Sequence, residues 1–163
     1  MNRRLAIKQI MIFGGGLALL PSGLKAAGKA SVWLNHVRMD AAEEKLLGEI
    51  AEIIIPKTTT PGAKDLGLHL FVMKMVDDCY KPQDQKRFMS GLAAFKGLDP
   101  SALNEMVVQV NAGKAESDDI KAFFRIMKQQ TINGYLNSKY VMTNLVKWEL
   151  VPARYNGYFP VKS

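Results

Sequence analysis

Side chains that could carry redox or metal chemistry are scarce in this chain of 163 residues. It has one cysteine, Cys79, and two histidines, His36 and His69. A c-type haem needs a Cys-x-x-Cys-His motif, an iron–sulfur cluster usually needs four thiolates, and thiol exchange needs a thiol pair, so the cysteine count excludes all three. The histidines lie far apart, without Cys or Asp at metal-ligand spacing, and we expect ordinary surface or core residues.

Carboxylates and glycines offer no stronger candidates. Asp77 and Asp78 are adjacent on an expected helix, so their side chains point apart and cannot pair as general acid and base. We predict that both lie on a solvated face. The threonine-rich stretch 58–64 lacks the spacing that cradles phosphate, and no Gly-x-Ser-x-Gly motif occurs. The sequence therefore predicts no catalytic, cofactor-binding or metal-binding residue in this chain.

The segment 1–30 has the composition of an export signal. Arg3, Arg4 and Lys8 precede an apolar and glycine-rich run over residues 10–20, and small residues follow it. The paired arginines predict the twin-arginine route, in which a translocase reads the motif as a label. As a helix, the run would be about 16 Å long, roughly half of a hydrocarbon core of about 30 Å. We therefore expect an exported, periplasmic protein and no transmembrane span here.

Two questions about this leader stay open. Asn2 and Ala6 depart from the usual twin-arginine pattern, so an ordinary secretory signal that happens to hold two arginines is the competing interpretation. Small residues permit cleavage at either of two places, using Ala26 with Gly28 or Gly28 with Ala30, and retention without cleavage is the third alternative.

The leader also accounts for most of the net charge of +7. Five basic and no acidic residues precede residue 31, so segment 31–163 carries 17 basic and 15 acidic residues. That balance is too even for the clustered basic face that nucleic acid requires, and we expect no nucleic-acid partner. The length of 31–163 suits one domain with its own core. A single thiol cannot form a disulfide within the chain, so we expect packing to stabilise this domain.

Helical periodicity dominates the part of the chain from residue 40 to residue 135. Asp40 with Glu43 predicts a capping box, and the helix that it opens should end at Pro56. A strand over 53–55 is the less favoured alternative. A loop is expected over 57–64, then a second helix over about 66–80. The residues expected on its inner side are Leu68, Phe71, Val72, Met75, Val76 and Cys79.

Three further helices are predicted downstream of Pro82. The first of them closes at Gly97, the next opens at Asp99, and the last is capped by Ser117 and interrupted or ended at 133–134. Their expected buried stripes are Phe88, Leu92 and Phe95, then Leu103, Met106, Val107 and Val110, then Ile120, Phe123, Phe124 and Met127. The expected fold class is all-α: a small irregular domain of about five helices with an extended C-terminal tail over 148–163.

Three segments combine into a family resemblance. Residues 55–64 contain Ile-Pro, threonines and Pro-Gly-Ala, residues 123–135 contain Phe-Phe, a basic helix and Gly-Tyr, and residues 148–158 contain an aromatic residue, Pro, Arg-Tyr and Asn-Gly. Together they resemble the gluconate 2-dehydrogenase subunit 3 family, the small subunits of membrane-bound, flavin-dependent sugar, polyol and sugar-acid dehydrogenases. Ala153 stands where the family often has glycine, and Tyr158 where it often has cysteine.

The resemblance implies a subunit that is not itself catalytic. In such complexes a large subunit holds FAD, a multihaem cytochrome c subunit passes electrons to quinone, and the small subunit carries the twin-arginine signal. By that likeness this chain would support maturation, export and stability of the flavin subunit, within a membrane-associated periplasmic complex. The alternatives are a stand-alone exported protein with a binding, enzymatic or structural role and no redox partner.

The tail supplies the candidate partner interface, because aromatic and arginine side chains dominate the energetics of protein interfaces. The candidate residues are Trp148, Pro152, Arg154, Tyr155, Tyr158 and Phe159. The alternative is that Trp148 and Tyr155 pack onto their own domain.

Overall fold

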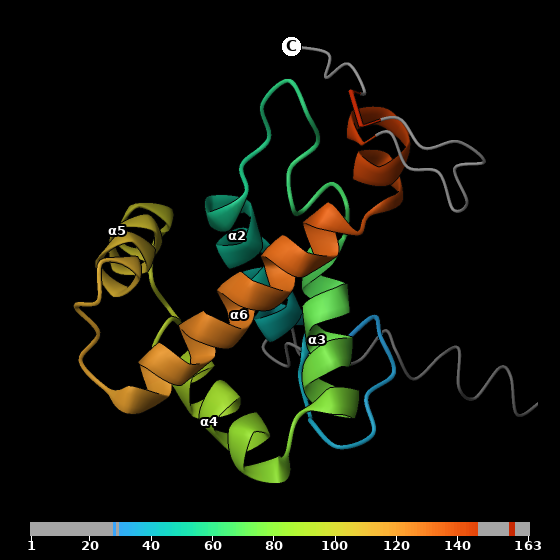
Figure 1. Ribbon diagram of the computed structural model, residues 1–163. Helices are drawn as coiled ribbons and strands as arrows, with labels where there is room; N and C mark the ends of the chain where they lie inside the picture. Colours follow the sequence, from blue (N-terminus) through green and yellow to red (C-terminus); the bar gives the residue numbers. More distant parts are fainter. Residues whose placement is uncertain (1–27, 29, 147–156, 159–163) are drawn as a thin grey trace, which may run out of the picture.

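The computed structural model describes residue 28, residues 30–146 and residues 157–158. Five α-helices and one short π-helix form there (Figure 1): α2 (Ala41–Ile54), α3 (Leu68–Cys79), α4 (Pro82–Ala93), α5 (Pro100–Asn111), α6 (Asp118–Leu136) and η2 (Val141–Leu145). No β-strand forms among these residues, and the all-α prediction is confirmed. The leader and almost all of the tail lie outside the described residues.

Local capping signals set where three of the helices begin. The Asp40 carboxylate accepts a hydrogen bond from the Glu43 backbone N–H, and the Glu43 carboxylate accepts one from the Asp40 N–H, which completes the predicted capping box. Asp99 caps α5 and Ser117 caps α6 through side-chain oxygens that accept backbone N–H groups, without the reciprocal bond of a capping box. Since Ile54 is the last residue of α2, the strand alternative for 53–55 is wrong.

Helix α6 lies at the centre of the described domain and packs against α2, α3, α4 and α5 (Figure 1). Its Phe123 ring lies 4.8 Å from the Phe88 ring and 5.1 Å from the Phe95 ring, measured between centroids. All three rings are fully buried. The residues predicted for the buried stripes of the last three helices are buried, except that Met106 is only partly buried. The predicted helix end at Gly97 is wrong, because α4 ends at Ala93 and Phe95 is buried from the turn that follows it.

A glycine sets the distance between α4 and α6. A Cβ atom placed on Gly91 would overlap the Cβ of Phe123 and lie 2.5 Å from the Asp119 carbonyl oxygen. Real Cβ atoms do not approach backbone that closely, so any side chain at this position would push the two helices apart.

Two predictions about α3 and α6 are wrong. Helix α6 continues through Gly134 to Leu136. A Cβ at Gly134 would lie 2.9 Å from the ring of Phe71, so the glycine allows α3 to approach and does not end the helix. On α3 itself, Phe71 is 40% exposed and Cys79 is exposed, although the periodicity predicts that both face inward. The buried residues of α3 are Leu68, Val72, Met73, Val76 and Asp77.

The buried face of α3 differs from the predicted one because three parts of the chain pack against this helix. It packs against α2 and α6, and the backbone of residues 35–37 also lies against its Asp77. Of the helices described, none has the length and apolar composition required to cross a bilayer.

Candidate interaction surfaces

The residues predicted for export and for the partner interface fall mostly outside the described part of the chain. Tyr158 is the one described member, and its side chain is 96% exposed. The undescribed members are Arg3, Arg4, Lys8, Trp148, Pro152, Arg154, Tyr155 and Phe159. Their roles stay predictions.

The first motif segment forms an exposed loop that we call the threonine loop, residues 55–67, which projects beyond α2 and α3 (Figure 1). One carboxylate closes it: Glu52 Oε1 accepts a hydrogen bond from Lys57 N at 2.9 Å, and Oε2 accepts one from Lys64 N at 3.0 Å. Lys57 Nζ also lies 2.8 Å from Asp65 Oδ2. The hydrogen bond from Lys57 holds the pKa of Asp65 below its ordinary value.

Gly62 is the position in this loop that admits no side chain. A Cβ there would lie 2.5 Å from both carboxylate oxygens of Glu52 and 2.7 Å from Lys57 N. The following residue, Ala63, is fully buried and donates its N–H to the Ile55 carbonyl oxygen at 2.9 Å. Packing thus explains the Gly-Ala part of the motif. Gly62 leaves room for the Glu52 carboxylate, and Ala63 supplies a small side chain that fits the core.

The structure brings two of the three motif segments together. Tyr135 Oη, near the end of α6, lies 3.1 Å from Thr60 Oγ1 in the threonine loop, and the two hydroxyls are hydrogen-bonded. Thr58 and Thr59 stay exposed. The sequence identified both segments but gave no sign that they meet.

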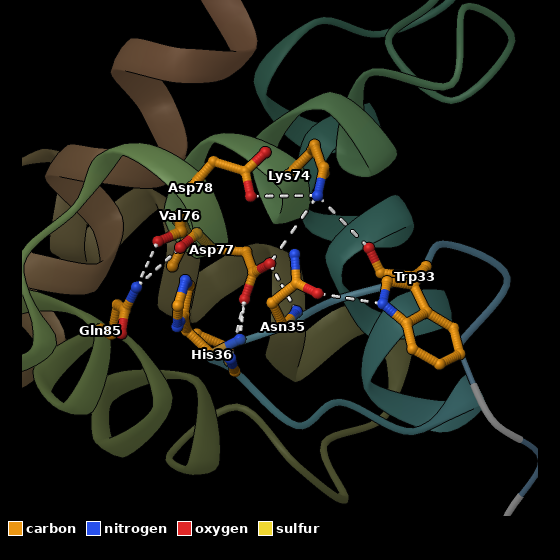
Figure 2. A network of polar contacts seen from close by, with 9 residues as sticks. Trp33, Asn35, His36, Lys74, Val76, Asp77, Asp78 and Gln85 are labelled. Carbon is orange, nitrogen blue, oxygen red and sulfur yellow. Dashed lines mark hydrogen bonds and ion pairs between the residues drawn. The ribbon is translucent and has the colours of Figure 1, made fainter.

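Asp77 forms a second polar cluster, which the sequence missed. Its Oδ1 accepts hydrogen bonds from His36 N at 2.6 Å and Val37 N at 2.8 Å, and its Oδ2 accepts one from Asn35 N at 2.7 Å (Figure 2). Lys74 Nζ lies 3.8 Å from Oδ2. The residue is 1% exposed, so the prediction of a solvated face is wrong for Asp77.

The hydrogen bonds decide the protonation state of this buried group. Burial opposes ionisation of Asp77, but the backbone N–H groups of residues 35–37, helped by the charge of Lys74, outweigh it and lower its pKa below the ordinary value of 3.8. A carboxylate whose oxygens accept three N–H groups is a structural anchor. No local pattern marked this burial, because Asp77 meets backbone that lies 40 to 42 residues earlier in the chain.

The anchored segment carries an exposed indole. We call residues 30–39 the tryptophan loop, in which Trp33 is 81% exposed and its Nε1 donates to Asn35 Oδ1 at 3.0 Å (Figure 2). Nearer the N-terminal end of the loop, the backbone N and Oγ of Ser31 each lie 2.6 Å from the Glu44 carboxylate. The loop is therefore tied to α2 and to α3.

A groove of about 690 Å³ lies between α2 and α5. Its lining is mainly apolar and includes Leu46, Ile53 and Leu103. Two of its carboxylates are already engaged, Glu49 by Lys64 Nζ at 2.6 Å and Glu52 by the threonine loop. The groove offers apolar area rather than a set of reactive groups.

The two histidines lie apart in the structure. His36 is exposed, whereas His69 is partly buried beside Gly48, with a ring Nδ1 that has no hydrogen-bond partner, and burial lowers its pKa. Within the described ranges, no group of three or more His, Cys, Asp and Glu side chains could hold a metal ion.

Comparison with known proteins gives one match. The family described as gluconate 2-dehydrogenase subunit 3 matches residues 41–153, which include all the described helices and the first part of the tail. No curated protein and no solved structure matches the chain. The match contains the threonine loop, the Phe-Phe helix and the start of the aromatic tail, and the chain belongs to the gluconate 2-dehydrogenase subunit 3 family.

Proposed function

We propose that this chain is the non-catalytic small subunit of a periplasmic, membrane-associated, FAD-dependent dehydrogenase complex of the gluconate, sugar or polyol type. The observation that carries the proposal is the family match over residues 41–153, since the family is that of a dehydrogenase subunit. In this proposal FAD belongs to a large partner subunit and haem c to a cytochrome subunit. The chain supports maturation, export and stability of the flavin subunit.

The polar clusters of the structure support a role through surfaces. The carboxylates of Asp77 and Glu52 accept backbone N–H groups, and each of them fixes a loop. Both loops present exposed residues, Trp33 in one and Thr58 with Thr59 in the other. Fixed exposed loops suit a subunit that binds another folded protein, because little ordering entropy is lost on binding.

Co-purification tests the proposal directly. The full chain, carrying an affinity tag after Ser163 on a flexible linker, is expressed in its own host and isolated under mild conditions. We expect a second, yellow polypeptide with the absorption spectrum of FAD and dehydrogenase activity toward a sugar, polyol or sugar acid. Recovery of the chain alone and colourless would contradict the proposal and favour the stand-alone exported protein.

Substitution of the arginine pair tests the export role. In the variant Arg3→Lys with Arg4→Lys, we expect both the chain and the flavin subunit to accumulate in the cytoplasm, because the translocase reads the paired arginines. Cell fractionation with activity and immunodetection measures the distribution. Lys29→Arg, which keeps the charge outside the motif, is the matched control and should leave both subunits in the periplasm. Normal export of the flavin subunit in the double variant would remove the carrier role.

A further inference from the structure

We propose that the groove between α2 and α5 holds the apolar run of this chain's own leader, residues 10–20, for as long as the leader stays attached. Bound there, the run is shielded from water and from other proteins before export. The inference concerns the chain by itself and does not depend on the proposed dehydrogenase partner.

The groove has the length and the character that this run requires. Its wall on α2 is one stripe along the helix, formed by Ala42, Leu46, Glu49 and Ile53 at spacings of three and four residues. From Ala42 to Ile53 the helix rises about 16 Å, which is also the length of residues 10–20 as a helix. The opposite wall begins at Leu98, an apolar side chain that is 37% exposed.

Gly28 places the end of the leader beside this groove. Its carbonyl oxygen accepts a hydrogen bond from the Ala41 N–H at 2.8 Å, and a Cβ on Gly28 would lie 3.4 Å from the Ala41 Cβ. Ala41 is the first residue of α2, and its neighbour one turn further along the helix surface, Lys45, lines the groove. The leader therefore joins the domain at one end of the groove.

The short connection favours the leader over a separate protein as the occupant. Residues 21–27 link the run to Gly28, and when extended they span roughly 26 Å, which is enough to reach any part of the groove. A segment attached through so short a linker has an effective concentration in the millimolar range. Modest apolar contacts are then sufficient to hold the run in place.

This connection also sets the direction of the run. Because the linker starts at the first turn of α2, residue 20 lies toward Ala42 and residue 10 lies toward Ile53. The run is thus antiparallel to α2. The basic residues that precede the run are then carried to the C-terminal end of that helix.

The charges at that end of the groove suit those basic residues. Glu49 and Glu52 line the groove there, and the last turn of α2 contains no basic residue. Glu49 is paired with Lys64, but the hydrogen bonds that Glu52 accepts come from uncharged backbone N–H groups. The carbonyl end of a helix also favours cations. Lys8, with the arginine pair ahead of it, would therefore meet a complementary surface.

Photo-crosslinking tests which segment occupies the groove. Asn104 is an exposed residue of α5 that lines it, so Asn104→p-benzoylphenylalanine should leave the fold intact, which circular dichroism checks. The full chain is made by cell-free synthesis, which keeps the leader attached, and is irradiated and digested. Mass spectrometry should find an adduct between α5 and residues 10–20 of the same chain. Glu105→p-benzoylphenylalanine, one residue further and outside the groove lining, is the matched control and should give none.

Each other product of this experiment contradicts the proposal. An adduct with residues 147–163 would show that the tail covers the groove, and an adduct of twice the chain mass would show that a second copy does. No adduct, or equal adducts from Asn104 and Glu105 positions, would show that the leader does not bind there. None of these results bears on the flavin partner, because the experiment contains this chain alone.

A polar substitution tests whether apolar contact holds the run. In the chain that carries the crosslinker at Asn104, Leu19→Asp should lower the adduct yield at least about tenfold, because a buried leucine side chain is lost. Leu24→Asp makes the same change in the linker, outside the run, and should leave the yield nearly unchanged. Equal effects of the two substitutions would overturn the proposed contact.

A pair of charge reversals tests the direction of the run. Lys8→Glu should lower the adduct yield at least about twofold, because it brings a negative charge to the end of the groove that holds Glu49 and Glu52. Lys25→Glu is the matched control at the other end, where Lys45 lines the groove, and should not lower the yield. A larger loss in Lys25→Glu than in Lys8→Glu would show that the proposed direction is wrong.

Discussion

A buried aspartate joins the tryptophan loop to the helical domain. Asp77 is 1% exposed, yet its pKa is lowered, because three backbone N–H groups and Lys74 favour the charged form more than burial disfavours it. Without the carboxylate, those N–H groups would lose their partners at a site that is buried for Val37 and part-buried for Asn35 and His36, which costs more than the bonds themselves contribute.

Asp77→Asn should therefore lower the free energy of unfolding at pH 7 by about 1–3 kcal/mol. A carboxyl group with a depressed folded-state pKa stabilises the fold above its unfolded pKa, near 3.8, and loses that contribution as the pH falls through the folded-state value. The stability gap between the unchanged chain and Asp77→Asn should thus be full above about pH 4 and shrink at lower pH.

Urea unfolding of both proteins at pH 7, 4, 3 and 2 measures this gap. Asp78→Asn is the control, because the Asp78 side chain is 41% exposed and its ion pair with Lys74 is a surface pair of small value. A gap that stays constant throughout the acid range would show that ionised Asp77 is not what stabilises the loop.

At the scale of helices, two glycines set how closely α6 approaches its neighbours. At Gly91 a side chain would meet the backbone of Asp119 and the Cβ of Phe123, neither of which can move without moving α6. At Gly134 it would meet the ring edge of Phe71, a partly exposed side chain that can rotate away. The two glycines look alike in the sequence and differ in what surrounds them.

Gly91→Ala should destabilise the protein by about 1–3 kcal/mol from overpacking, even though alanine favours the helix by up to about 1 kcal/mol. Gly134→Ala is the matched comparison and should change stability by less than about 1 kcal/mol, because the gain in helix propensity offsets the movement of one ring. Thermal unfolding followed by circular dichroism gives both values. A larger loss at Gly134 than at Gly91 would contradict this account of the α4–α6 contact.

At the scale of the whole molecule, the core of the described part is built from residues that precede the predicted interface tail in the sequence. The buried hydrophobic residues of the described part all lie between Val37 and Val141, before the predicted interface tail begins at residue 148. The fold and the partner surface are therefore expected to be separable by truncation.

Removal of residues 148–163 should leave helical content and Tm nearly unchanged and abolish co-purification with the flavin subunit. Circular dichroism and isolation through the tagged flavin subunit measure the two properties. A shorter deletion of residues 160–163 is the control and should preserve binding, because it keeps every residue predicted for the interface. Undiminished binding after the longer deletion would show that the tail packs only on its own domain or has no role in assembly.

Much of the fold follows from the sequence alone. Asp40, Asp99 and Ser117 mark helix starts because a cap and the N–H groups that it binds lie within four residues of each other. The threonine loop could be predicted for the same reason, since threonine, proline and glycine restrict the backbone locally. The family resemblance also follows from the sequence, because each of its three motif segments is a run of neighbouring residues.

The tertiary structure alone decided the features that join distant residues. Asp77 is buried because it meets backbone 40 to 42 residues earlier, and Tyr135 reaches Thr60 across 75 residues. Gly134 lies inside α6 where a side chain would meet Phe71 of α3, and Trp33 is exposed on a loop whose backbone Asp77 fixes. Periodicity and capping report interactions within a few residues, whereas these contacts depend on how separate helices pack, which no local pattern encodes.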